Sequence, residues 1–125
     1  MRIARTSEVE PEPMTTDTFT GQVRRRDLGR IGAPEGSALA VSFEAGVRTD
    51  WHRHSAGQVL YVLDGNGRVG TRDGEVVEIG EGDLVEAPPG EEHWHGAAER
   101  APVTHLALSF GETEWLEPVS QDPVS

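Results

Sequence analysis

The sequence of 125 residues contains no cysteine, and its longest uninterrupted apolar run extends only from Val59 to Leu63. The absence of cysteine excludes disulfides and thiolate metal sites, and it is typical of a cytosolic protein. An apolar run of this length is far too short to cross a membrane. Residues 1–5 also lack the apolar core of a secretory signal. We therefore expect a cytoplasmic protein.

Basic residues are also scarce. The chain has 11 Lys and Arg against 22 Asp and Glu, a formal net charge of −11. Nucleic acids and anionic membranes both require a basic surface, so neither is an expected partner. The basic cluster Arg24-Arg25-Arg26 is interpreted as a solvated strand edge that discourages unwanted pairing. A small-molecule substrate is the partner that this composition leaves open.

No stretch carries a helical period, whereas short strand-like runs alternate with glycine and proline turns. Asp64-Gly65-Asn66-Gly67 is predicted to be the turn of a hairpin between two of these runs. Short, evenly spaced strands predict an all-β, antiparallel barrel of the jelly-roll kind. The expected strands are Phe19–Val23, Ala38–Phe43, Gln58–Leu63, Arg68–Thr71, Val76–Ile79, Leu84–Ala87, His93–Ala97 and Val103–Phe110.

The chain has the length of one domain. Residues 1–17 are rich in Glu, Pro and Thr and show neither structural period, so they are predicted to form a flexible arm. The ordered domain is expected to cover residues 18–117, and residues 118–125 are expected to form a C-terminal tail.

Four of the 5 histidines lie in two short stretches. Side chains two apart on a strand point to the same face, so His52 pairs with His54, and His93 pairs with His95. Imidazoles held side by side can chelate a divalent first-row metal, and Gln58 can add an oxygen donor. One such pair is often an ordinary surface feature. Two pairs, both set between glycines, indicate a metal site.

The framing residues have a recognisable spacing. The first stretch reads G-x5-H-x-H-x3-Q-x6-G from Gly46 to Gly65, and the second reads G-x5-P-x-G-x2-H from Gly82 to His93. Both stretches resemble the two motifs of the cupin superfamily. The resemblance implies a jelly-roll cupin domain, also described as a double-stranded β-helix. It further implies a metal with four protein ligands, namely His52, His54, Gln58 and His93.

Gln58 stands where the first cupin motif usually has Glu, and Ala97 stands where the second usually has Asn. A neutral amide leaves the charge of a divalent cation uncancelled, so we expect weaker binding but a stronger Lewis acid. Mixed nitrogen and oxygen donors favour Mn²⁺ or Fe²⁺ ahead of Zn²⁺. Ni²⁺, Co²⁺ or copper would bind at least as tightly, so the identity of the metal stays open. Mn²⁺ is the first expectation.

A closer resemblance extends from Thr18 to Trp115, to the small bacterial cupins that include manganese-dependent hydroxynitrile lyases. It is carried by Thr18–Arg24, the Gln form of the first motif, Pro89–Ala98 and Thr104–Leu108. In that family both departures just noted are usual, and histidines at the positions of His95 and His105 belong to the active site.

The lyases carry Gln where this chain has Ser109, a position that lines their substrate pocket. The lyase resemblance implies cleavage of a cyanohydrin to aldehyde and cyanide, with the metal polarising the hydroxyl. His95 is the expected base, and His105 is expected to hold either that base or the departing cyanide. On chemistry alone, a packing role for His95 or His105 remains open.

Two other functions also suit these residues. Three imidazoles and an oxygen donor with open positions fit a metal-dependent oxygenase. A module that binds a small molecule, without catalysis, is the third possibility. In cupins the N-terminal strand often adds to a neighbouring subunit, so the resemblance also implies a homodimer or a higher homo-oligomer.

Overall fold

The computed structural model describes residues 2, 4–14, 18–32 and 35–120. Within these residues the chain is all-β apart from one short 3-10 turn, η1 (Thr6–Glu8). The strands are β1 (Glu12–Pro13), β2 (Val23–Gly32), β3 (Glu35–Phe43), β4 (His52–His54), β5 (Gln58–Thr71), β6 (Val76–Gly80), β7 (Leu84–Ala87), β8 (His93–Ala97), β9 (Val103–Phe110) and β10 (Thr113–Trp115). No helix in the described part of the chain is long and apolar enough to cross a membrane.

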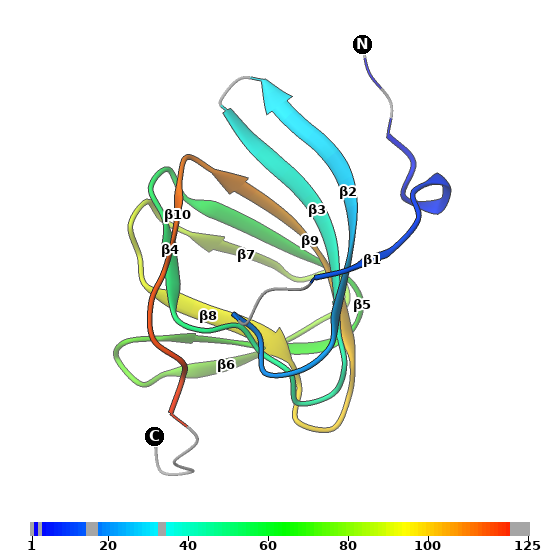
Figure 1. Cartoon of the computed structure of the whole chain (residues 1–125). Coiled ribbons are helices and arrows are strands. Elements are labelled where there is room, and N and C mark those ends of the chain that lie inside the picture. The colour runs from blue at the N-terminus through cyan, green and yellow to red at the C-terminus, as the bar shows by residue number, and fades with distance from the viewer. Residues whose placement is uncertain (1, 3, 15–17, 33–34, 121–125) are drawn as a thin grey trace.

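The strands form one antiparallel sheet in the order β1-β2-β3-β9-β5-β8-β4-β10, and β6 and β7 also pair with β5. Figure 1 shows how this sheet curls, so that β2, β3 and β9 face β4, β8 and β10 across the interior. The predicted jelly-roll barrel is confirmed.

One strand, β5, passes through both halves of the curled sheet. Its first part pairs with β9 and β7, and its last five residues pair with β8. The predicted hairpin turn at Asp64-Gly65-Asn66-Gly67 is therefore wrong. The pairing register with β9 shifts between Val62 and Asp64, and Gly65 has a φ of 83°. A Cβ at Gly65 would collide with the carbonyl oxygen of Pro102. The glycine thus bends a continuous strand where another segment approaches it closely.

The N-terminal region differs from the sequence prediction at its first strand. Only Val23 of the expected strand Phe19–Val23 lies in β2, and Phe19 makes an isolated bridge to Thr49. β1 pairs with β2 opposite Arg24 and Arg25, so the backbone of this edge is partly covered, while Arg24 is exposed to solvent and Arg25 and Arg26 are half-buried. Residues 1, 3 and 15–17 of the predicted flexible arm lie outside the described residues, as do residues 121–125 of the tail. The flexibility of the arm stays a prediction.

A cluster of buried apolar side chains fills one part of the interior. Its members are Val23, Val41, Phe43, Val47, Val62, Ile79, Ala97 and Val103. Burying one of the Val, Ile or Phe side chains contributes about 1.5–3 kcal/mol. The ring of Phe43 contacts the rings of His95 and His105, with centroids 5.9 and 5.3 Å away. The apolar core therefore packs directly against His95 and His105 through Phe43.

Candidate metal centre

The four predicted ligands come from three neighbouring strands. His52 and His54 lie on β4, Gln58 begins β5 and His93 begins β8. His52 is paired directly with His93 across β4 and β8. All four residues are buried, with exposed fractions of 1% for His52, 5% for His54, 4% for Gln58 and 5% for His93. The ring centroids of His52 and His93 are 4.5 Å apart, and those of His54 and His93 are 5.7 Å apart. The structure thus brings all four side chains together in the interior.

Hydrogen bonds set the orientation of these imidazoles. His52 Nδ1 donates to the carbonyl of Asp50 at 2.9 Å, and His93 Nδ1 donates to the carbonyl of Glu91 at 2.9 Å. A carbonyl can only accept, so the proton of each neutral ring is on Nδ1 and the lone pair is on Nε2. This is the tautomer that binds a metal through Nε2.

Three polar atoms of the predicted ligands lack a suitable partner within the protein. His54 Nε2 is buried and makes no hydrogen bond. Gln58 Oε1 lies 2.9 Å from His93 Nε2, although both atoms present lone pairs when His93 is a neutral ring protonated on Nδ1. Buried lone pairs left unpaired or facing each other are costly, and a shared cation relieves both situations. These residues therefore fit a divalent metal ion.

Burial keeps the ligands in the form that a metal requires. Burial, with a smaller contribution from the nearby His93, lowers the pKa of His52 to about 3 and the pKa of His54 to about 4. Burial also lowers the pKa of His93 itself. All three imidazoles are therefore neutral at pH 7 and need not lose a proton before they bind a cation.

The two predicted catalytic histidines lie beside the ligands. His95 on β8 and His105 on β9 are both buried, and His95 Nδ1 lies 3.1 Å from His105 Nε2. Burial is the main cause that lowers the pKa of each, to about 4 for His105 and well below its usual value for His95. One candidate ligand atom on each of His52, His93 and His95 lies within 4.8 Å of the other two. His95 is thus placed as either a base or a further ligand, and both assignments stay predictions.

A cavity of about 150 Å³ opens onto the site. Ser109, predicted to line the substrate pocket, is one of its lining residues, and its Oγ accepts a hydrogen bond from Gln58 Nε2 at 2.9 Å. The wall is otherwise largely apolar, with contributions from Met14, Phe19, Leu39, Val41, Phe43 and Trp115.

Sequence reasoning missed two site residues on β10. Thr113 Oγ1 lies 2.9 Å from His54 Nδ1, and the Trp115 ring lies 4.6 Å from the His52 ring. Thr113 and Trp115 are two residues apart, the same spacing that identified the histidine pairs. Nothing local, however, indicated that their strand pairs with β4.

Comparisons with known proteins agree with this geometry. The family described as cupin domain matches residues 39–109. An (R)-mandelonitrile lyase from Granulicella tundricola is 43% identical over 113 residues, covering 85% of each chain. The crystal structure of a cupin-like protein from Thermotoga maritima superposes with a TM-score of 0.82 and 36% identity, covering 88% of this chain and 87% of the other.

A more limited similarity connects the chain to a second enzyme class. An acireductone dioxygenase from Rhodopseudomonas palustris is 36% identical over 63 residues, which cover 48% of this chain and 35% of that enzyme. Named relatives therefore include both a lyase and a dioxygenase, and a cluster of histidines that could hold a metal ion suits either one.

Proposed function

Because this chain belongs to the cupin family, we propose that it is a metal-dependent lyase that cleaves a cyanohydrin into an aldehyde and hydrogen cyanide. The observation that carries the proposal is one small, largely apolar cavity that both predicted metal ligands and His95 line. The lining ligands are His52, His54 and Gln58. His95 is in turn hydrogen-bonded to His105. The (R)-mandelonitrile lyase that is 43% identical supports the same reaction.

His52, His54, Gln58 and His93 are the proposed ligands, and Mn²⁺ is the proposed metal. A bound divalent cation would supply Lewis acidity toward the hydroxyl of the substrate. Gln58 contributes no negative charge, so this ligand set leaves that acidity undiminished.

His95 is the proposed base. It is neutral at pH 7 because burial and the neighbouring histidines lower its pKa, so it can accept the hydroxyl proton. As that proton leaves, the bond between the carbinol carbon and the nitrile carbon breaks, and cyanide departs with the electron pair. The imidazolium of His95 then returns the proton to give hydrogen cyanide. His105, 3.1 Å from His95 Nδ1, orients the ring for both transfers.

The cavity limits the size of the substrate. Its volume of about 150 Å³ is similar to that of an apolar protein cavity that accepts one benzene ring. Small aromatic or short aliphatic cyanohydrins are therefore the proposed substrates. The short side chain of Ser109 leaves space at the position where a longer one would narrow the pocket.

The test measures cyanide release from racemic mandelonitrile by the metal-free protein and after Mn²⁺, Fe²⁺ or Zn²⁺ is restored. A reaction without protein corrects for spontaneous decomposition. We expect cleavage that depends on the metal and on His95. A metal-loaded protein that releases cyanide no faster than buffer would refute the lyase proposal.

A metal-dependent oxygenase is the second candidate, favoured by the similarity to acireductone dioxygenase and by the cluster of three histidines. Oxygen electrode measurements with a small dione or enediol distinguish the two activities. Cyanohydrin cleavage involves no redox change and consumes no oxygen.

A further inference from the structure

The C-terminal strand β10 lies against the candidate metal centre. It pairs with β4 so that Thr113 is opposite His54 and Trp115 is opposite His52. Both side chains line the cavity, and Thr113 Oγ1 is 2.9 Å from His54 Nδ1. β10 pairs with no other strand among the described residues. The position of β10 relative to the site therefore depends on its pairing with β4 and on the contacts of the segment that follows it.

The hydrogen bond between Thr113 and His54 differs in kind from those of the other two ligand histidines. His52 and His93 each donate to a backbone carbonyl two residues earlier, which can only accept. The partner of His54 is a hydroxyl, which can either donate or accept. When His54 binds a cation through Nε2, its proton must be on Nδ1, and the Thr113 hydroxyl then has to accept it.

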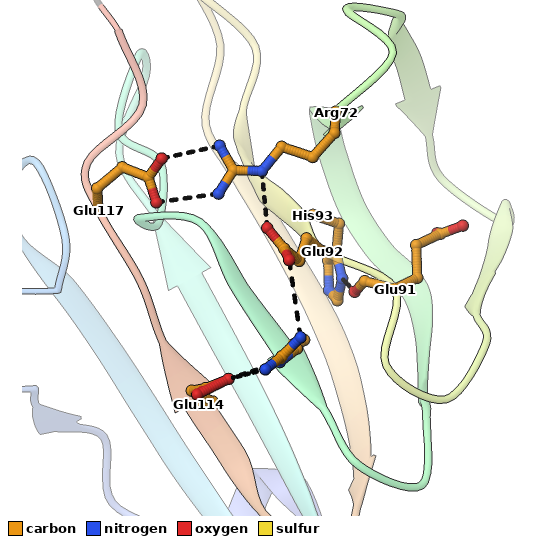
Figure 2. A network of polar contacts seen from close by, with 7 residues as sticks. Arg72, Glu91, Glu92, His93, Glu114 and Glu117 are labelled. Carbon is orange, nitrogen blue, oxygen red and sulfur yellow. Dashed lines mark hydrogen bonds and ion pairs between the residues drawn. The ribbon is translucent and has the colours of Figure 1, made fainter.

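A chain of ion pairs holds the C-terminal segment in place. Figure 2 shows the Arg72 guanidinium between Glu117, at 2.9 and 3.0 Å, and Glu92, at 2.8 Å. Arg53 continues the chain, because it contacts Glu92 at 3.7 Å and also pairs with Glu114. An isolated exposed pair contributes about 0–1 kcal/mol. Here, however, five charged groups connect β4, the residue preceding His93 and the C-terminal segment.

Backbone hydrogen bonds reinforce the same connection. Leu116 N donates to the carbonyl of Trp51 at 2.8 Å, and Trp51 N donates to the carbonyl of Glu117 at 3.0 Å. These bonds fix the register of β10 on β4, and that register places the Thr113 hydroxyl at His54.

We propose that Thr113 is a positioning residue of the metal centre, which accepts the Nδ1 proton of His54 and so keeps Nε2 available for the cation. The ion pairs of Arg53 and Arg72 hold Thr113 in this position. The inference rests on the proposed metal centre but is independent of which reaction takes place there.

The test compares the Mn²⁺ affinity of the wild type with those of Thr113→Val and Thr113→Ser, measured by competition with a chromophoric chelator. Valine keeps the β-branched shape and removes the hydroxyl. Loss of such a partner typically weakens metal binding about 10- to 100-fold, and we expect Thr113→Val to fall in this range. Thr113→Ser restores the hydroxyl and should restore the affinity.

Thr104→Val is the matched control, since its hydroxyl is hydrogen-bonded to Ser42 at 2.9 Å and Thr104 does not line the cavity. Its Mn²⁺ affinity should equal that of the wild type. Thermal unfolding verifies that each variant is folded. If Thr113→Val binds Mn²⁺ as tightly as the wild type, the role of Thr113 is refuted, whereas the metal centre and the lyase proposal stand.

A second measurement does not depend on affinity. In the zinc-loaded, diamagnetic protein, the His54 Nδ1 proton should give a hydrogen-bonded signal in ¹⁵N–¹H correlation spectra. We expect Thr113→Val to shift this signal upfield and to accelerate its exchange with water. An unchanged signal would overturn the proposal.

The wild type distinguishes failure of this proposal from failure of the others. A wild type that binds neither Mn²⁺ nor Zn²⁺ would overturn both this proposal and the metal centre. A metal-loaded wild type that fails to cleave cyanohydrins would overturn only the lyase proposal.

Discussion

Lowering the pH should destabilise the metal-free protein through its buried histidines. The pKa of His52 is lowered to about 3, and those of His54 and His105 to about 4, from 6.5 in the unfolded chain, with burial as the main cause. Between pH 6.5 and about 4 the unfolded chain therefore binds more protons than the folded one. The free energy of unfolding must fall as the pH decreases through this window, and these groups have no such effect above it.

The size of the effect follows from the shifts. Each such histidine reduces the free energy of unfolding by about 1.4 kcal/mol per pH unit. At pH 5, which is 1.5 units below 6.5, this amounts to about 2 kcal/mol per histidine and about 6 kcal/mol for the three together. His93 and His95 have lowered pKa values as well and add to the loss. Because native proteins are stable by about 5–15 kcal/mol, the metal-free protein should be close to unfolding at pH 5.

Urea unfolding monitored by tryptophan fluorescence at pH 7.5, 6 and 5 measures this loss. The range stays above the usual pKa of Asp and Glu, so histidines dominate the slope. The control is His105→Gln, in which the slope should decrease by about 1.4 kcal/mol per pH unit. An unfolding midpoint that does not change between pH 7.5 and pH 5 would refute the conclusion that these histidines are buried in their neutral form.

Four further predictions concern the site directly. Elemental analysis should find about one metal ion per chain in the wild type and almost none in His93→Ala, because this substitution removes the ligand that contacts both His52 and Gln58. His95→Ala should keep the metal but abolish cyanide release; loss of the metal instead would make His95 a ligand, as its proximity to His52 and His93 allows. Gln58→Glu should bind Mn²⁺ more tightly and cleave cyanohydrins more slowly, because a carboxylate cancels part of the cation's charge; chelator competition and initial rates test the two effects, and weaker binding would contradict the ligand assignment. Ala107→Leu should fill part of the cavity of about 150 Å³ and reduce the kcat/KM for mandelonitrile more than that for acetone cyanohydrin, and an equal reduction would contradict the assignment of this cavity to the substrate.

The sequence alone was sufficient for features that depend on local periodicity. Side chains alternate along a strand, so the spacing of His52 and His54 is enough to place both on one face. The strand Val103–Phe110 was predicted with the bounds that it has in the structure. The motif spacing was also sufficient for the family, which matches residues 39–109.

Other features were decided by segments that are distant in sequence. Asp64-Gly65-Asn66-Gly67 carries the same local signal whether the chain reverses or only bends, and the approach of Pro102 selected the bend. Thr113 and His54 are 59 positions apart, so only the pairing of β10 with β4 brings a hydroxyl to that imidazole. The lowered pKa values of the histidines likewise arise from burial, which requires the whole sheet to curl. The sequence determined which faces the side chains occupy, whereas closure of the sheet determined which faces meet.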